Sequence, residues 1–491
     1  MLRQIDAVKK KKTGRSAQAR PQRKVENPVK APLCEFVKKY AAGNTLRLHM
    51  PGHKGQGMFD VEKFDITEIH GADVLYAADG VLRESQDNAS QLFGSGTTVY
   101  SAEGSSLSIR AMLYLALLCK KEAGKPVILA ARNAHKTFLS AAALLDFEIE
   151  WLYPAPEETG GGLLSCPISP AHLRQKIEQM ERGEPKGNGG GKKPVAFYLT
   201  SPDYLGNLQD VEALARICHE NGILFLVDNA HGAYLQFLPV SRHPMALGAD
   251  ACCDSAHKTL PVLTGGAYLH ISAQAPAVMI ENATRAMELF ASTSPSYLIL
   301  QSLDAANGYL DGAFRADLRQ TIERVDLLKN RLTEKGLCLV GKEPLKLTVM
   351  PKPFGYTGTE LASFLRAQGV ECEFSDPDFT VMMFAPGIGE ADFAKLWRIL
   401  AALPARPAIA EAPPPLTAPR RALSPREAIL APSELLPVEE CFGRVLAQAN
   451  VACPPAIPIV SLGEVIGNEE MRLFAYYGIP QARVVRETEK R

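Results

Sequence analysis

The sequence lacks any continuous apolar run of the about 18 residues that a membrane-spanning helix requires. Its first thirty residues also lack the apolar core of a secretory signal. Net charge is absent too, because 54 basic residues balance 54 acidic ones. Since no overall field attracts nucleic acid or an anionic membrane surface, we expect a protein that binds neither of them.

Cysteine pairing is the next absence. The ten cysteines are scattered, and none of them forms a Cys-x-x-Cys pair. A chain of 491 residues can bury a sizeable core without disulfides, so we expect free thiols, no metal site and a reducing, cytoplasmic location. The length also exceeds the ~250–300 residues at which one core stops growing, which predicts two or three domains.

Composition and periodicity divide the chain into five segments. Residues 1–30 form a basic, polar tail, expected to be disordered, although anion docking or an organelle transit peptide would also fit. We expect a large domain over residues 31–300 and a small α/β domain over 301–403. A Pro/Ala-rich linker covers 404–427, and a C-terminal unit follows over 428–491.

Apolar strand-like runs alternate with helical stretches up to about residue 275. The runs "PVILAA", "VAFYLTSP" and "ILFLVDNAHG" are apolar on both faces, as buried parallel strands are. Helical stretches such as "SSLSIRAMLYLALLCKKEAG" lie between strand-like runs and end at glycine. The alternation predicts an α/β domain with a mainly parallel sheet.

Four polar clusters follow strands of this predicted sheet, at the edge where open α/β sheets bind ligands. In "YSAEGSSLS", Gly104, Ser105 and Ser106 put two hydroxyls at a helix N-terminus. Such a turn suits an anion, but it is also an ordinary way to begin a helix. His135 follows a strand in "ARNAHKT", and Asp228 ends the strand in "LFLVDNAHG".

The fourth cluster, "CDSAHKTLP", contains Ser255, His257 and Lys258. A lysine taken alone is usually an exposed, solvated charge. Together, however, the clusters supply what pyridoxal 5'-phosphate (PLP) requires: an anion site for the phosphate, a flat imidazole for the ring, a carboxylate for the pyridine nitrogen and a lysine for the aldehyde. Because these roles are complementary, the sequence predicts a PLP enzyme.

The sequence resembles the Orn/Lys/Arg decarboxylase family of fold-type I PLP enzymes, in its shorter bacterial-type branch, from about residue 31 to 478. The matching stretches include "LRLHMPGHKG", "SAEGSSLSIRAM", "LVDNAHGAY", "DSAHKTLPVLTGGAYLH", "STSPSYLILQSLDAA" and "CPPAIPIVSLGEVI". The resemblance implies an aspartate-aminotransferase-like large domain and decarboxylation of arginine, lysine or ornithine to CO₂ and an amine, which would feed polyamine synthesis. It also implies a homodimer or higher homo-oligomer with active sites at the subunit interface.

The resemblance further implies roles for individual residues. Lys258 would bind the PLP aldehyde, Asp228 would pair with the pyridine nitrogen, and His135 would stack on the ring. His231 would lie near the reacting carbon, and Lys258 or His257 would return the proton. The phosphate would be bound or oriented by Gly104, Ser105, Ser106, Ser255 and His257, and by Thr293 and Ser294 of a neighbouring subunit.

Three points stay open in the sequence. A basic substrate needs an acid at the far end of the pocket, and the candidates are Glu464 and the Asp376/Asp378 pair, each of which could instead be a surface acid. Glu103 stands where many relatives have an asparagine, and an acid so close to a phosphate must point away. Another fold-type I reaction such as transamination, or a non-catalytic PLP-fold regulator, is the alternative function.

Overall fold

The computed structural model describes residues 29–121, 123–154, 165–183, 192–416, 418–452 and 457–487. The predicted basic tail therefore lies almost entirely outside the described residues. Within them, no helix combines the length and the apolar character that crossing a membrane would demand.

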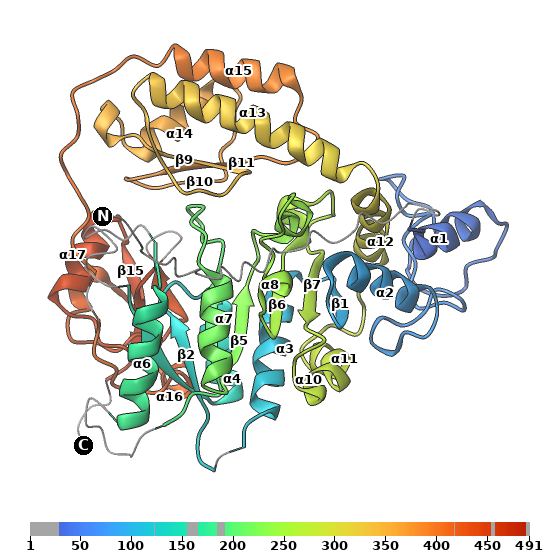
Figure 1. The fold of residues 1–491 in the computed structure, drawn as a ribbon, viewed down its shortest axis with the longest axis horizontal. Helices are drawn as coiled ribbons and strands as arrows, with labels where there is room; N and C mark the ends of the chain where they lie inside the picture. The colour runs from blue at the N-terminus through green and yellow to red at the C-terminus, as the bar shows by residue number, and fades with distance from the viewer. Residues whose placement is uncertain are drawn as a thin grey trace, which may run out of the picture.

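A seven-stranded sheet forms the centre of the large domain, in the order β1-β7-β6-β5-β4-β2-β3 (Figure 1). Its strands are β1 (Thr97–Ser101), β2 (Val127–Ala131), β3 (Glu148–Leu152), β4 (Ala196–Thr200), β5 (Leu224–Asp228), β6 (Ala251–Asp254) and β7 (Ala267–Ile271). Strands β2 to β6 pair in parallel, whereas β7 runs antiparallel to β1 and β6. The prediction of an α/β fold with a mainly parallel sheet is confirmed.

Both faces of the sheet are buried, which explains why its strands are continuously apolar. Val127 and Leu129 pack on one face with α6 (Pro170–Arg182) and α7 (Val211–Glu220). Ile128 and Ala130 point to the other face. There they pack with α3 (Gly104–Leu118), α4 (Lys136–Leu145), α10 (Ala277–Glu281) and α11 (Ala283–Glu288).

A third apolar cluster lies at the β1 edge of the domain. It is formed by α1 (Pro32–Ala42), α2 (Val81–Phe93), α12 (Tyr297–Asp311) and the first turns of α13 (Phe314–Glu334). The long helix α13 then continues into the core of the small domain, where Val325, Leu328 and Leu332 are buried. This helix therefore links the two domains mechanically.

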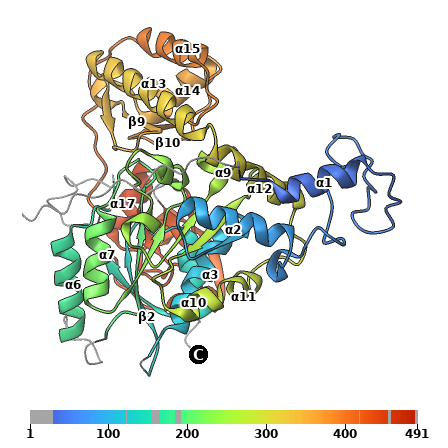
Figure 2. The same cartoon turned by 45° about the vertical axis from the view of Figure 1, so that its right-hand side comes forward.

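The small domain is an antiparallel sheet in the order β10-β11-β9-β8, covered by helices (Figure 2). The strands are β8 (Cys338–Val340), β9 (Lys346–Met350), β10 (Phe374–Ser375) and β11 (Thr380–Met383), and the helices are α13, α14 (Gly358–Ala367) and α15 (Glu390–Ala401). Figure 2 shows this domain stacked on the large domain on the side of the short helix α9 (Ala256–Thr259).

The C-terminal unit packs against the large domain. It contains α16 (Pro425–Leu430), β12 (Ser433–Pro437) paired with β15 (Gln481–Val485), β13 (Asn450–Ala452) paired with β14 (Pro458–Ser461), and α17 (Asn468–Tyr476). Ile459, Leu473 and Val484 belong to the same apolar cluster as Val127 and Leu129 of β2. The unit thus shares a core with the large domain, beside β2 and α6 in Figure 1.

Candidate functional site

Lys258 lies in α9, a single helical turn that follows directly after β6. The turn places the lysine at the carboxyl end of the parallel strands, where α/β sheets form ligand sites. Its Nζ lies 3.0 Å from Nε2 of His231. Burial lowers the pKa of Lys258, and the charge of Asp228 opposes that shift only in part. The environment therefore favours the neutral amine of Lys258 more than water does.

Asp228 is the last residue of β5 and is 2% exposed. Its carboxylate accepts hydrogen bonds from the Tyr198 hydroxyl at 2.9 Å and the Ala230 N–H at 3.2 Å. The Cys253 thiol donates to the same carboxylate at 3.5 Å. These donors fix a buried acceptor at the strand end, as a partner for a cationic ring nitrogen requires.

His135 is the N-cap residue of α4. The Thr137 N–H donates to its Nδ1 at 3.3 Å, so the proton of the neutral ring lies on Nε2. Burial lowers the pKa of His135, and Lys258 adds to that effect, whereas Asp228 opposes it. The ring is therefore neutral, lies near both Asp228 and Lys258, and is bonded through its edge rather than its faces.

Four hydroxyls meet at the N-terminus of α3. The Ser255 hydroxyl donates to Ser105 Oγ at 2.8 Å, and Ser106 Oγ lies 3.1 Å from Thr137 Oγ1. Gly104 has φ of +70°, and a Cβ on it would meet nothing within 4 Å, so the space beside this turn is open. Free N–H groups and the positive helix end complete a donor set that suits a phosphate.

The remaining residues of the predicted phosphate site differ in position. Glu103 points away from the hydroxyls, because its carboxylate accepts the Ser292 N–H at 2.7 Å. His257 Nδ1 donates to the Gly266 carbonyl at 3.0 Å, beside the site. Thr293 and Ser294 are exposed on the single chain, and their contribution to a neighbouring subunit stays a prediction.

Sequence reasoning missed Lys346 and Glu343 of the small domain. Lys346, in β9, places its Nζ 3.4 Å from His231 Nδ1 and 2.9 Å from a Glu343 carboxylate oxygen. Tyr204 meets the His231 ring edge to face, with centroids 5.1 Å apart, and donates its hydroxyl to Glu373 at 2.8 Å. The one available signal was a lysine inside the apolar strand "LKLTVM".

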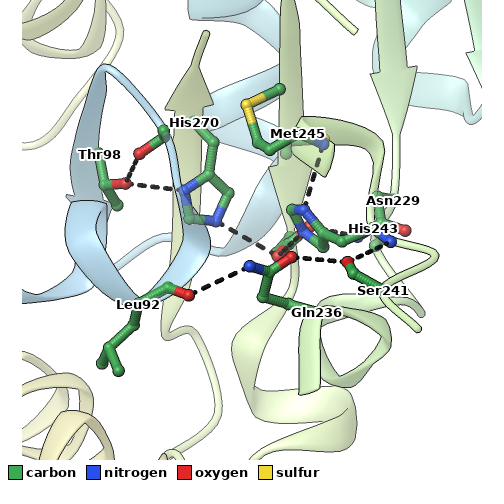
Figure 3. A network of polar contacts seen from close by, with 12 residues as sticks. Leu92, Thr98, Asn229, Gln236, Ser241, His243, Met245 and His270 are labelled. Carbon is green, nitrogen blue, oxygen red and sulfur yellow. Dashed lines mark hydrogen bonds and ion pairs between the residues drawn. The ribbon is translucent and has the colours of Figure 1, made fainter. Parts of the chain in front are cut away.

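A network of buried polar side chains, with Asn229, His243 and His270 labelled in Figure 3, surrounds the carboxylate of Asp254. Asp254 accepts hydrogen bonds from Asn229 Nδ2 at 2.6 Å and His243 Nε2 at 2.9 Å, and it lies 3.3 Å from His270 Nε2. Burial would raise the pKa of Asp254, but the two histidines outweigh it and hold that pKa well below its ordinary value. The cluster joins β5, β6 and β7 just before the turn that carries Lys258.

His243, Asp254 and His270 have the composition of a metal site, with ligand atoms all within 4.8 Å of one another. The direction of the hydrogen bonds argues otherwise. The Met245 N–H donates to His243 Nδ1 at 3.3 Å, so His243 Nε2 carries the proton and faces Asp254 as a donor. This cluster is a hydrogen-bonded network that fixes the backbone.

The three acids expected at the substrate's far end have other partners. Asp378 accepts hydrogen bonds from Lys352 Nζ at 2.8 Å and from the Tyr476 hydroxyl at 2.6 Å. Both oxygens of Glu464 accept from the Arg132 guanidinium at 2.7 Å, and the pair is almost fully buried. Asp376 accepts the N–H groups of Asp378 and Phe379 at 2.7 and 2.6 Å, and burial raises its pKa to about 7. Their contacts do not support a substrate role for any of them, whereas Glu373 accepts a hydrogen bond from Tyr204, whose ring contacts His231.

Comparisons with known proteins agree on one family. The family model described as Orn/Lys/Arg decarboxylase, major domain, matches residues 31–339. The arginine decarboxylase of Bacillus subtilis is 27% identical over 472 residues, 90% of this chain and 92% of that protein. The arginine decarboxylase of Halalkalibacterium halodurans is 29% identical over 89% of this chain and 91% of its own.

Solved structures show the same architecture. The lysine decarboxylase of Francisella novicida superposes with a TM-score of 0.77 at 17% identity, covering 93% of this chain and 81% of its own. The constitutive lysine decarboxylase of Escherichia coli gives a TM-score of 0.73, also at 17% identity, over 93% of this chain and 82% of its own. At this identity the likeness establishes the fold.

Proposed function

Because the chain belongs to the Orn/Lys/Arg decarboxylase family, we propose that it removes the α-carboxylate of a basic amino acid, with PLP as cofactor and arginine as the first candidate substrate. The proposal is carried by the meeting of Lys258, Asp228 and His135 at one sheet edge. Arginine is favoured because two relatives named arginine decarboxylases align over about nine tenths of this chain.

The donor set fits PLP group by group. The hydroxyls of Ser105 and Ser255 and the N-terminus of α3 would hold the phosphate. Asp228 would keep the pyridine nitrogen protonated, and the neutral His135 ring would lie against the cofactor ring. Lys258, which lacks a carboxylate ion pair among its described contacts, would bind the aldehyde.

The cofactor, when bound, supplies an electron sink for the pair of electrons left behind when CO₂ departs. The chain's own residues would orient the cofactor and supply the proton to the α-carbon. Asp228, fixed by Tyr198 and Ala230, would stabilise the protonated ring nitrogen of the bound cofactor. The amine of Lys258 would be placed to return a proton to the α-carbon of the substrate, and His257 would be the alternative donor.

For the cationic end of the substrate, we propose Glu373 in place of Glu464 and Asp376. Its carboxylate is exposed, accepts the Tyr204 hydroxyl at 2.8 Å, and acts electrostatically on Lys258. A guanidinium donates in a planar fork that matches a carboxylate, which suits arginine. Glu373→Gln is expected to raise KM for arginine about tenfold or more with a smaller change in kcat. Glu371→Gln, which removes an exposed acid paired with Arg366, is the matched control.

The decisive experiment is CO₂ release from carboxyl-labelled arginine, lysine and ornithine by the PLP-loaded protein. Release from one of the three, lost in Lys258→Ala, supports the proposal and identifies the substrate. No release from any of them, with a PLP absorbance band that disappears in Lys258→Ala, would refute the decarboxylase and retain the cofactor site. A keto-acid product would instead establish transamination.

Assembly and location are part of the same proposal. Thr293 and Ser294 are exposed on the single chain, as residues that complete a neighbour's phosphate site would be, so we propose a homodimer or higher oligomer. The nine cysteines among the described residues are free thiols, which suits a reducing cytoplasm. An amine product would feed polyamine synthesis. Sedimentation at equilibrium tests the oligomer.

A further inference from the structure

A chain of polar contacts leads from the small domain to Lys258. Glu343 forms an ion pair with Lys346 at 2.9 Å, and each of these side chains is 1% exposed. Lys346 Nζ lies 3.4 Å from His231 Nδ1, and the opposite ring nitrogen, Nε2, lies 3.0 Å from Lys258 Nζ. One imidazole thus joins two lysines that belong to different domains.

The donors and acceptors along this chain allow one arrangement of protons. A lysine ammonium has donors and no acceptor. Lys346 forms an ion pair with Glu343, donates to the Asp203 carbonyl at 3.1 Å and lies 3.4 Å from His231 Nδ1. His231 Nδ1 must therefore offer its lone pair, so the ring proton lies on Nε2. That proton points at Lys258 Nζ, which can accept it only as an uncharged amine.

We propose that Lys346, paired with Glu343, is a positioning residue that fixes the His231 tautomer and thereby keeps Lys258 a neutral amine. The inference rests on the proposed role of Lys258, because a neutral amine is the form that condenses with an aldehyde, giving a C=N bond and one water. The device is complete only when the small domain is seated on the large one.

We call the chain of contacts from Glu343 through Lys346 and His231 to Lys258 the relay. The charged and titratable groups around it affect the protonation of Lys258 in opposite directions. Asp228 and Glu373 favour the charged form of Lys258, whereas burial and Lys346 favour the neutral form. His135 and His257 also face His231. Burial and the two lysines lower the pKa of His231 well below its usual value. His231 therefore stays neutral and can pass on the orientation that Lys346 imposes.

The test measures Lys258 itself in the full-length protein freed of cofactor. Acetic anhydride labels neutral amines, so pulse labelling at a series of pH values, read by mass spectrometry of the Lys258 peptide, gives the pH at which half of the lysine is reactive. Lys346→Met should raise this pH by about one unit, or about tenfold in reactivity at fixed pH, because a positive neighbour and a fixed tautomer are lost.

Two variants separate the relay from simple loss of structure. Lys346→Arg keeps a charged group without acceptors and should restore the wild-type midpoint. Lys352→Met removes another buried small-domain lysine, which pairs with Asp378 at 2.8 Å, and should leave the midpoint of Lys258 unchanged. If Lys346→Met does not fold, Glu343→Gln takes its place and should shift the midpoint in the same direction.

Two results would overturn the relay. One is an unchanged midpoint in folded Lys346→Met. The other is the same shift caused by Lys346→Met in a His231→Phe background, because Lys346 would then act through space rather than through the ring. Labelling requires no turnover, so the relay can fail while CO₂ release succeeds, and the reverse outcome is equally visible.

Discussion

Two basic side chains at the ends of sheet strands, Arg132 and Lys258, have opposite surroundings. Arg132, just after β2, donates from both terminal nitrogens to Glu464 at 2.7 Å. Its guanidinium also lies over the rings of Trp151 and Tyr153, at 4.9 and 5.3 Å from their centroids. Lys258, in contrast, hydrogen-bonds to a neutral imidazole, and no ion pair is recorded for it within the described part of the chain.

The difference separates a structural charge from a reactive one. Burial would lower the pKa of Arg132, but Glu464 outweighs it and raises that pKa, so the guanidinium stays charged and holds the C-terminal unit to the large domain. Burial lowers the pKa of Lys258 without full compensation. A buried basic group with a complete ionic partner serves the fold, whereas a basic group without one is available for chemistry.

The largest effect is expected at Lys258. Lys258→Met should reduce decarboxylation on the order of 10³-fold or more, because the amine that binds the aldehyde and returns the proton is lost. The free energy of unfolding of the cofactor-free variant should stay the same or rise, since an unneutralised buried amine is removed. CO₂ release and urea unfolding measure the two effects. A marked loss of stability would show that Lys258 has a structural counter-ion after all.

Arg132 should give the reverse pattern. Arg132→Met leaves Glu464 charged and buried, which costs about 3–5 kcal/mol of unfolding free energy. Arg132→Met with Glu464→Met should recover most of that loss, because neither charge then remains. Urea unfolding of the two variants measures both values, with the exposed Arg366→Met as control. If Arg132→Met alone kept the stability of the wild type, water would have to reach Glu464 and solvate its charge.

The tendency of α/β sheets to bind ligands at the carboxyl ends of their strands explains which site residues the sequence could predict. Asp228, His135, Ser105 and Lys258 each follow or precede an apolar strand, and parallel strands bring their carboxyl ends to one edge of the sheet. Their meeting therefore needed no knowledge of tertiary packing. The mainly parallel sheet followed from strands that are apolar on both faces.

Residues whose role depends on contact between distant segments could not be predicted. Glu464 lies 332 positions from Arg132, so nothing local distinguishes it from an acid in a substrate pocket. Lys346 enters the site from another domain, and its position depends on how that domain packs. The local sequence specifies which groups a strand end offers, and the packing of units decides which of them meet a partner.

Asp304 is an acid for which the described residues provide no basic partner, and it shows the same principle for a negative charge. Asp304 is fully buried, and burial raises its pKa to about 6, although the Cys34 N–H donates to it at 2.9 Å. Between an unfolded-state pKa of about 3.9 and this folded value, the folded protein binds more protons, so stability falls as pH rises through that window. Asp304→Asn should remove the fall.

The expected gain is about 2–3 kcal/mol in Asp304→Asn relative to wild type at pH 7, shrinking towards zero near pH 4. Urea unfolding at both pH values measures it. Asp317→Asn is the control, because that acid accepts the Tyr309 hydroxyl at 2.6 Å in a partly buried position. A gain in unfolding free energy that does not change with pH would contradict the raised pKa of Asp304.

The smallest effect concerns a hydroxyl whose proposed partner is the cofactor phosphate. Ser105→Ala removes one donor at the α3 N-terminus and should weaken PLP binding about 3–10-fold, the range for one hydrogen bond to an anion beside a helix end. Binding of pyridoxal, which has no phosphate, should not change. Absorbance titration of the cofactor-free protein measures both ligands, and Ser90→Ala in α2 is the matched control, since that hydroxyl bonds only to Gln86 O among its described contacts. Equal losses for both ligands would place Ser105 against another part of the cofactor, and the phosphate would then have to be held by Ser255, Ser106 and the backbone of α3 alone.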